Sequence, residues 1–330
     1  MERKRIFCLD FIRAVALFCI IWCHTNNVAY DFYLMEKVKW FFGKCGVPLF
    51  FIISGYLAFP LNKPLKQYAI GKIKRVVIPF IAWVVIYAAL AFFRGYPVFV
   101  EGDLLNEGSA HLWFIYVIIG LYLVVPILDP FIRMADEKVL RFYLVTWIFT
   151  GLFPLLQHIT NVPFNEHCWM YTLYHLYGYT GYFILGYYLK KYGDGTRIVN
   201  LKISVILMGI SILLVGTYFF VFDCHTVLVS DYKGLPIMLY AIAMYSILKK
   251  VSIYVERLGL NKCVTSLSVN SFGIYLIHMI VVMFIYPIIP QFSVVPALLT
   301  TTILVIINIA LSYGVVYFAS KFRYAHYIFG

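Results

Sequence analysis

Residues 6–28 read IFCLDFIRAVALFCIIWCHTNNV, and this stretch decides the fold. It is long and apolar enough to cross a lipid bilayer, for which an α-helix needs about 20 residues. It nevertheless contains three ionisable side chains, those of Asp10, Arg13 and His24. Because ionisable side chains within a membrane span cost free energy, they mark candidate functional positions.

The three side chains are spaced to share one face of the predicted helix. Arg13 and His24 are eleven positions apart, which at about 100° per residue brings them within about 20° of the same direction. Asp10 lies one turn before Arg13, about 40° from His24. One face therefore carries an acid–base pair near its start and an imidazole about 16 Å further on. The alternative is structural: Asp10 and Arg13 pair at the membrane edge, and His24 bonds a neighbouring helix.

The composition extends the membrane interpretation to the whole chain. Of the 330 residues, 63% are hydrophobic and 13% are charged, and the mean hydropathy is +0.86. About a quarter of the residues in a soluble domain are charged. Long apolar runs recur from end to end, and the first is too long for a typical secretory signal peptide. We therefore predict an all-α, polytopic integral membrane protein with one membrane-embedded domain over residues 1–330.

The sequence predicts about ten transmembrane helices, which is an even number. They lie near 6–28, 43–60, 75–94, 111–129, 140–158, 172–190, 203–222, 232–249, 269–289 and 294–318. The segments on the N-terminal side of these spans hold 21 of the 27 Lys and Arg residues. The positive-inside rule therefore predicts cytoplasmic termini and a multi-pass protein of the inner, cytoplasmic membrane. The same alternation explains the net charge of +12 without a nucleic-acid partner.

The predicted inner loop 60–75 is strongly basic and has no acidic residue. Its charges are those of Lys63, Lys66, Lys72, Lys74 and Arg75. The loop is either a topology signal that contacts anionic membrane lipids or a site for a phosphorylated ligand. Ser54 and Gly55 interrupt the span before it. The Ser54 hydroxyl needs a partner, whereas Gly55 allows close approach of a neighbouring helix or of a ligand.

Further candidates lie at and beyond the opposite membrane edge. His111 and Trp113 begin the fourth span at the edge where a ligand from outside the cytoplasm would enter. His175 ends a stretch that is rich in His and Tyr. These residues either line a sugar site or only anchor the chain at the interface. His278 lies in mid-span and is either a site residue or a helix–helix contact. The seven cysteines are scattered without a CxxC motif, so we predict no metal site.

The first span resembles that of the acyltransferase 3 family of integral-membrane acyltransferases. The marker of that family is a basic residue, ten residues and then a His, here Arg13 and His24. Other family-like stretches follow in the expected order: GVPLFFIISGYL (46–57), the basic pair Lys72 and Arg75, HLWFIYVIIGLYLVVP (111–126), GYFILGYYL (181–189) and SFGIYLIH (271–278). The pair departs from the family's Arg-x-x-Arg, because its first member is Lys72. A lysine keeps the positive charge but lacks the bidentate hydrogen-bonding geometry of an arginine.

The resemblance implies an O-acyltransferase that moves an acyl group, most often acetyl, from cytoplasmic acyl-CoA to a hydroxyl of a cell-surface or lipid-linked glycan. It implies that His24 is the catalytic base or nucleophile and that Asp10 orients Arg13. It places acyl-CoA at Arg13, Ser54, Lys72, Lys74 and Arg75. The candidate acceptor-binding residues, chosen from their positions in the chain, are His111, Trp113, His175 and His278. The separation of Arg13 and His24 is comparable to an extended phosphopantetheine arm.

Two other classes of protein share some of these features. A transporter or flippase for a lipid-linked glycan also has many spans and intramembrane charges, but it predicts symmetry between the halves of the chain and broken helices at matching positions. A non-catalytic membrane sensor or scaffold needs no Arg13–His24 stripe beside a basic inner loop. Acyl transfer that depends on His24 would exclude both classes.

Overall fold

The computed structural model describes residues 5–25, 43–95, 110–160, 176–193, 200–220, 232–285, 288–290 and 293–330. Within these ranges the chain forms helices and no β-strand. The longer helices are α1 (Phe7–His24), α3 (Gly46–Ala58), α5 (Ile78–Phe93), α6 (Trp113–Met134), α7 (Glu137–Thr150), α10 (Thr180–Tyr192), α11 (Leu201–Phe220), α13 (Leu235–Arg257), α14 (Asn261–Ile285) and α15 (Val294–Ala319). The shorter segments are α4 (Leu65–Lys72), the π-helical turn η1 (Ile73–Val77), the 3₁₀ turn η2 (Ala110–Leu112), α8 (Phe153–Thr160) and α16 (His326–Phe329).

Seven helical segments of the described residues are long and apolar enough to cross a membrane. They are Phe7–His24, Leu65–Phe93, Trp113–Met134, Glu137–Gln157, Leu235–Arg257, Asn261–Ile285 and Pro296–Ala319. The remaining three predicted spans coincide with α3, α10 and α11, which are not among these seven segments. The all-α polytopic fold is therefore confirmed, whereas the total of about ten spans and the side of the termini stay predictions.

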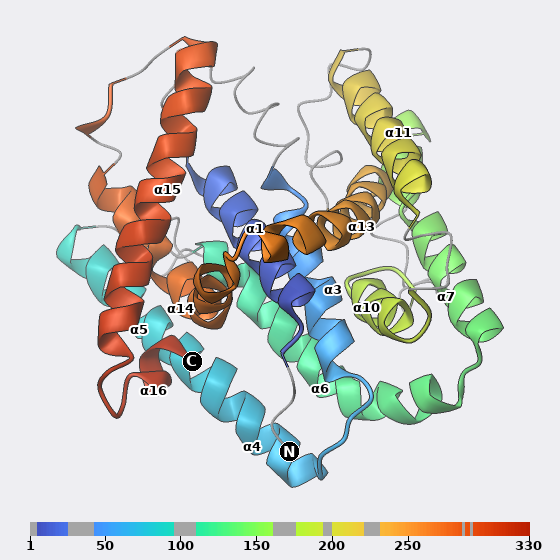
Figure 1. Ribbon diagram of the computed structural model, residues 1–330, viewed down its shortest axis with the longest axis horizontal. Helices are drawn as coiled ribbons and strands as arrows, with labels where there is room; N and C mark the ends of the chain where they lie inside the picture. Colours follow the sequence, from blue (N-terminus) through green and yellow to red (C-terminus); the bar gives the residue numbers. More distant parts are fainter. Residues whose placement is uncertain are drawn as a thin grey trace.

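Helix α1 lies in the middle of the bundle (Figure 1) and packs against α3, α13, α14 and α15. Its side chains Leu17, Ile20 and Ile21 are buried in the main core. The helix ends at His24, because Thr25 has extended backbone angles and its hydroxyl donates a hydrogen bond to the Ile21 carbonyl at 2.8 Å. This ending places His24 at the rim of the bundle.

Glycines bring α3 and α10 into backbone contact. A Cβ atom added to Gly55 would overlap the backbone of Phe183, and one added to Gly186 would lie 2.7 Å from the Tyr56 nitrogen. Small residues allow membrane helices to approach this closely. Of the two interpretations left open for Gly55, the structure therefore supports helix packing.

A second set of contacts fastens the loop that follows α3. The Asp129 carboxylate accepts a hydrogen bond from the Leu61 amide at 2.7 Å, and Arg133 donates to the Leu61 carbonyl at 2.5 Å. Lys190 donates to the Phe59 carbonyl, also at 2.5 Å. Helices α6 and α10 therefore both hold this loop, which we call the α3 clasp.

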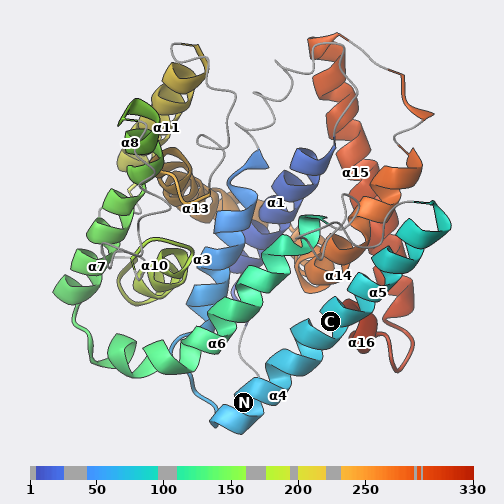
Figure 2. The same ribbon diagram turned by 180° about the vertical axis from the view of Figure 1, so that it is seen from behind.

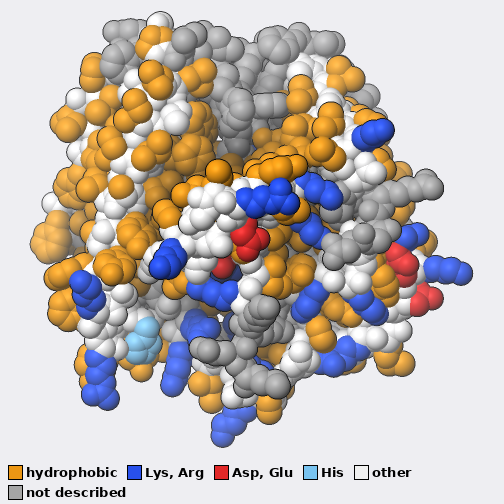
Figure 3. Space-filling model, viewed as in Figure 1, with side chains coloured by type: hydrophobic (Ala, Val, Ile, Leu, Met, Phe, Trp, Pro, Cys, Tyr) orange, Lys and Arg blue, Asp and Glu red, His pale blue; other side chains and the backbone are white. Residues whose placement is uncertain are grey.

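The charged side chains are unevenly distributed over the surface. In Figure 3, Lys and Arg gather on the lower half of the molecule, and hydrophobic side chains cover most of the described upper half. Seen from behind, α6 lies across α3, and α4 lies at the lower edge with α5 rising from it (Figure 2). Large hydrophobic residues such as Ile127, Phe142 and Phe318 are exposed on their helices. Such exposure is expected where helices face lipid.

Candidate functional site

Three histidines from distant parts of the chain meet at the end of α1. His24 is the last residue of α1, His111 lies in η2, and His278 lies in α14. The ring centroids of His24 and His278 are 5.0 Å apart, those of His111 and His278 are 5.1 Å apart, and those of His24 and His111 are 6.1 Å apart. We call these residues the histidine cluster.

One hydrogen bond joins His24 to His278, and a second joins His278 to the backbone. His24 Nδ1 lies 2.8 Å from His278 Nε2. His278 Nδ1 lies 2.5 Å from the Tyr275 carbonyl oxygen. His278 is completely buried, and the side-chain amide of Asn308 donates a hydrogen bond to the backbone carbonyl of His278 at 3.1 Å. The position of the His24 ring is therefore tied to α14, which is in turn bonded to α15.

His111 occupies a different environment within the histidine cluster. It is 5% exposed, and neither ring nitrogen has a hydrogen-bond partner of normal geometry among the described residues. Its ring packs edge-on against Tyr87 and Tyr275, and the Tyr275 hydroxyl bonds its backbone carbonyl. Because buried polar groups are usually hydrogen-bonded, this environment sets His111 apart from His24 and His278.

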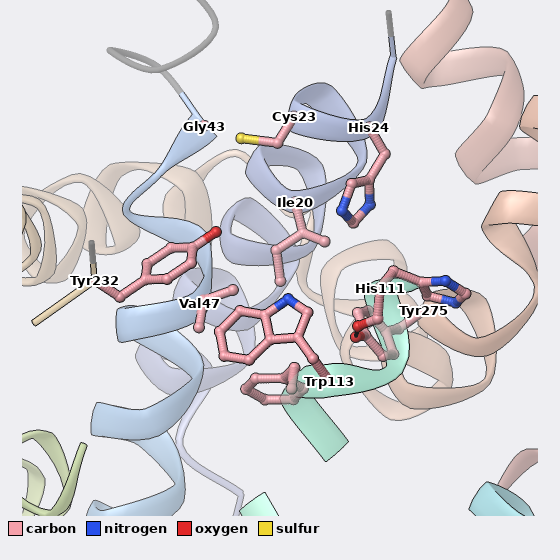
Figure 4. A pocket seen from close by; sticks show the side chains of 10 residues that line it. Ile20, Cys23, His24, Gly43, Val47, His111, Trp113, Tyr232 and Tyr275 are labelled. Carbon is pink, nitrogen blue, oxygen red and sulfur yellow. Dashed lines mark hydrogen bonds between the residues drawn. The ribbon is translucent and has the colours of Figure 1, made fainter. Parts of the chain in front are cut away.

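A pocket opens beside the histidine cluster and encloses about 290 Å³ of empty space, including its mouth. Figure 4 shows His24 and Cys23 above it, His111 and Tyr275 on one side, and Tyr232 on the other. The Trp113 ring stacks on that of Tyr232 with centroids 5.4 Å apart, and the Lys44 amine lies 4.7 Å from the Tyr232 ring centroid. The pocket therefore combines aromatic walls with polar groups, which suits an amphipathic ligand.

A second polar group of residues forms near the other end of α1. The Lys72 amine lies 3.3 Å from the Tyr122 ring centroid, and the Tyr122 hydroxyl is within hydrogen-bonding reach of Ser54 and Lys72. Arg13 lies close enough to Tyr122 and Asp10 to interact with both electrostatically. We call Arg13, Ser54, Lys72 and Tyr122 the basic cluster. Three of its four members were predicted from the sequence to bind acyl-CoA.

Lys74 and Arg75 lie apart from the basic cluster. Both belong to the π-helical turn η1, and both are exposed. Within the described part of the chain neither forms an ion pair or a hydrogen bond through its side chain. The five predicted donor-binding residues therefore divide into three gathered around Tyr122 and two on the surface nearby.

Asp10 contacts more than its expected partner. Its carboxylate accepts a hydrogen bond from Ser268 on α14 at 2.6 Å, and Arg5 Nε lies 3.8 Å from the other oxygen. Between Asp10 and Arg13 the contact is electrostatic and involves no ion pair within 4 Å. Asp10 therefore fastens the start of α1 to α14 as well as lying beside Arg13.

The predictions for His175 and for a metal site concern different parts of the chain. His175 lies outside the described residues. Among those described, no group of three His, Cys, Asp or Glu side chains has the arrangement to hold a metal ion. The histidine cluster is no exception, because His24 and His278 direct ring nitrogens at each other.

Sequence reasoning missed three residues that the fold brings to these sites. They are Tyr122 and Ser268, which bond predicted site residues, and Tyr232, which forms a wall of the pocket. A hydroxyl in the middle of an apolar run was an available signal for Tyr122, since buried hydroxyls need partners. Ser268 lies in the polar stretch TSLSVNS (265–271), which does not single it out. No comparable signal distinguished Tyr232 among 28 tyrosines.

The comparisons with known proteins agree with the helical architecture. A family model described as the acyltransferase domain, acyltransferase 3, matches residues 6–317 of the chain. The chain matches no curated protein and no solved structure. The matched range includes the histidine cluster, the basic cluster and the pocket.

Proposed function

The chain belongs to the acyltransferase 3 family and is a membrane acyltransferase, and from this premise we propose that it acylates a glycan across the membrane. The donor is acyl-CoA, most often acetyl-CoA, bound from the cytoplasm. The acceptor is a hydroxyl of a cell-surface or lipid-linked glycan on the other side. The observation that carries the proposal is the presence of two polar sites on one helix, the basic cluster and the histidine cluster.

The basic cluster suits the phosphates of the donor. Arg13 and Lys72 supply two positive charges next to the Ser54 and Tyr122 hydroxyls. Hydrogen bonds from cations to phosphate are stronger than those between neutral groups. Lys74 and Arg75, exposed on η1, extend the positive surface toward water. They attract the anionic donor by longer-range electrostatics.

The histidine cluster suits the chemical step. A neutral His24 accepts the proton of the acceptor hydroxyl, and the oxygen attacks the thioester carbonyl. The new acyl–oxygen bond forms, the acyl–sulfur bond breaks, and the proton passes from His24 to the departing CoA thiolate. His111 and the aromatic walls of the pocket orient the acceptor. The same imidazole could instead carry the acyl group as a nucleophile, and a labelled acyl-enzyme that accumulates without acceptor would identify that route.

The orientation follows from the charge distribution. We propose that both termini are cytoplasmic in the inner membrane, as the alternation of basic segments predicts. The gathering of Lys and Arg on one half of the surface supports this orientation (Figure 3). A reporter fused after Gly330 should be active only if it is of the cytoplasmic type. Activity of a periplasmic reporter at that position would contradict the orientation.

The decisive experiment measures acyl transfer directly. Purified protein in detergent is supplied with acetyl-CoA carrying a labelled acetyl group, and label in extracted glycans is compared with that from protein-free samples. In parallel, mass spectrometry compares glycan ester content in cells with and without the chain. Loss of specific esters together with label transfer supports the proposal. Glycan translocation without any ester difference would contradict it and would favour a flippase.

A further inference from the structure

We propose that His278 is a positioning residue that fixes the tautomer of His24, so that Nε2 of His24 is the nitrogen that takes the proton. This inference rests on the proposed function, because it assigns a partner to the catalytic His24. It also gives His278 a role other than the acceptor binding that the sequence suggested. The completely buried His278 side chain has no surface to offer an acceptor.

The first step is the protonation of His278 Nδ1. This nitrogen lies 2.5 Å from the Tyr275 carbonyl oxygen. A carbonyl oxygen can only accept a hydrogen bond, so the hydrogen belongs to His278 Nδ1. The contact lies within α14, where residues 275 and 278 are about one turn apart. It is therefore built into the helix and does not depend on a ligand.

The second step is the state of the other nitrogen. Among the described residues, the rings that contact His278 belong to His24, His111 and Tyr275, and none is acidic. A positive charge in this completely buried position would be costly to desolvate. The ring is therefore neutral, and its Nε2 carries a lone pair and accepts a hydrogen bond.

The third step transfers this constraint to His24. His278 Nε2 lies 2.8 Å from His24 Nδ1, and because the former accepts, the latter must donate. A neutral His24 with its hydrogen on Nδ1 has its lone pair on Nε2. The two rings are nearly parallel, with 19° between their planes. Two consecutive hydrogen bonds thus run from His24 to His278 and from His278 to the Tyr275 carbonyl.

This arrangement supports each stage of the proton transfer. Before the reaction it keeps the His24 lone pair on one defined nitrogen. After Nε2 has taken the proton from the acceptor hydroxyl, the imidazolium still donates its Nδ1 hydrogen to His278. An oriented acceptor behind a catalytic imidazole has this role in serine hydrolases, where it is a carboxylate. A neutral imidazole holds the tautomer without adding a negative charge.

Two substitutions at position 278 test the inference kinetically. His278→Phe keeps a planar ring of similar size and removes the acceptor, whereas the carbonyl oxygen of His278→Gln can replace Nε2. We expect His278→Phe to lower kcat roughly tenfold to a hundredfold, by analogy with the loss of the hydrogen-bond partner that orients a metal-bound histidine, with the KM for acetyl-CoA unchanged. His278→Gln should recover most of the lost kcat. Wild-type kcat in folded His278→Phe protein would overturn the proposal.

A spectroscopic measurement tests the tautomer without using catalysis. In protein with ¹⁵N-labelled histidine, the His24 signals are assigned by their loss in His24→Ala. We expect an unprotonated Nε2 and a protonated Nδ1 in the wild type, and a shift toward the other tautomer in His278→Phe. A wild-type His24 with its hydrogen on Nε2 would overturn the inference even if the Phe variant failed to fold. Full acyl transfer by His24→Ala would instead contradict the proposed function and leave the tautomer result standing.

Discussion

The two ends of α1 differ in how their polar residues are held. At the histidine end, His24 bonds a fully buried ring whose own partner is a backbone carbonyl. At the other end, Arg13 and Lys72 surround an aromatic hydroxyl, and Lys74 and Arg75 are exposed on the neighbouring η1 turn. The first arrangement specifies the position of one atom. The second offers positive charge over a wider area, which is what a large polyanionic donor requires.

The largest effect should come from the histidine end. We expect His24→Ala to reduce turnover by about 10² to 10⁴-fold, the usual contribution of a general base. Acyl-CoA affinity should be unchanged, because the basic cluster lies about 16 Å away along the helix. The measurement is turnover per folded, donor-binding molecule. The matched control is His326→Ala, because His326 is exposed on α16. Equal turnover in the two variants would show that His24 is structural.

The next largest effect should come from the basic cluster. We expect Lys72→Met to weaken acyl-CoA binding by about 1.5–3 kcal/mol, the scale of hydrogen bonds to charged groups. The reason is that Lys72 is half-buried beside Tyr122. Arg75→Met should cause a smaller loss, because an exposed charge is screened by water and salt. Titration with a non-hydrolysable acyl-CoA analogue measures both. A larger loss in Arg75→Met would place the donor phosphates on η1.

A third substitution tests the frame between the two ends. Gly186→Ala inserts a methyl group against the backbone of α3, which we expect to destabilise the protein by about 1–3 kcal/mol. Gly120→Ala on α6 is the control, because no heavy atom lies within 4 Å of the added Cβ. Thermal unfolding in detergent compares the two. Similar unfolding temperatures would mean that α3 and α10 can separate at no cost.

The smallest effect should come from the bond at the start of α1. Ser268→Ala removes the hydrogen bond to the buried Asp10 carboxylate, which we expect to cost about 1 kcal/mol of stability. Turnover per folded molecule and acyl-CoA affinity should both persist. Chemical denaturation together with the transfer assay measures these quantities. A selective loss of acyl-CoA affinity would show that Ser268 positions Arg13 through Asp10.

The sequence predicted the all-α membrane-spanning fold, because the apolar length of a helix is a local property. A membrane helix must satisfy its own backbone, so apolar length alone identifies it. The stripe of Asp10, Arg13 and His24 follows from helical periodicity within one segment. Ser54 and Lys72 were also selected from their own surroundings, and the fold brings both to Tyr122.

The contacts between helices could not be predicted in the same way. The bond from His24 to His278 joins residues 254 positions apart, and neither segment encodes its neighbour. Membrane helices are apolar on most faces, so hydrophobic periodicity does not show which face meets which partner. The π-helical turn at Ile73–Val77 was missed for a related reason, because the run is compatible with an ordinary α-helix.

The α3 clasp has a mechanical consequence for the donor end of α1. Hydrogen bonds from α6 and α10 immobilise the chain below Ser54, and most of α3 is buried. By contrast, α4 and η1 contain no fully buried residue. Segments with few buried contacts open at the lowest free energy. The α3 side of the basic cluster is therefore held by more buried contacts than the α4–η1 side, where Tyr68 donates a hydrogen bond to the Tyr122 carbonyl. A large ligand would meet less resistance from the α4–η1 side than from α3.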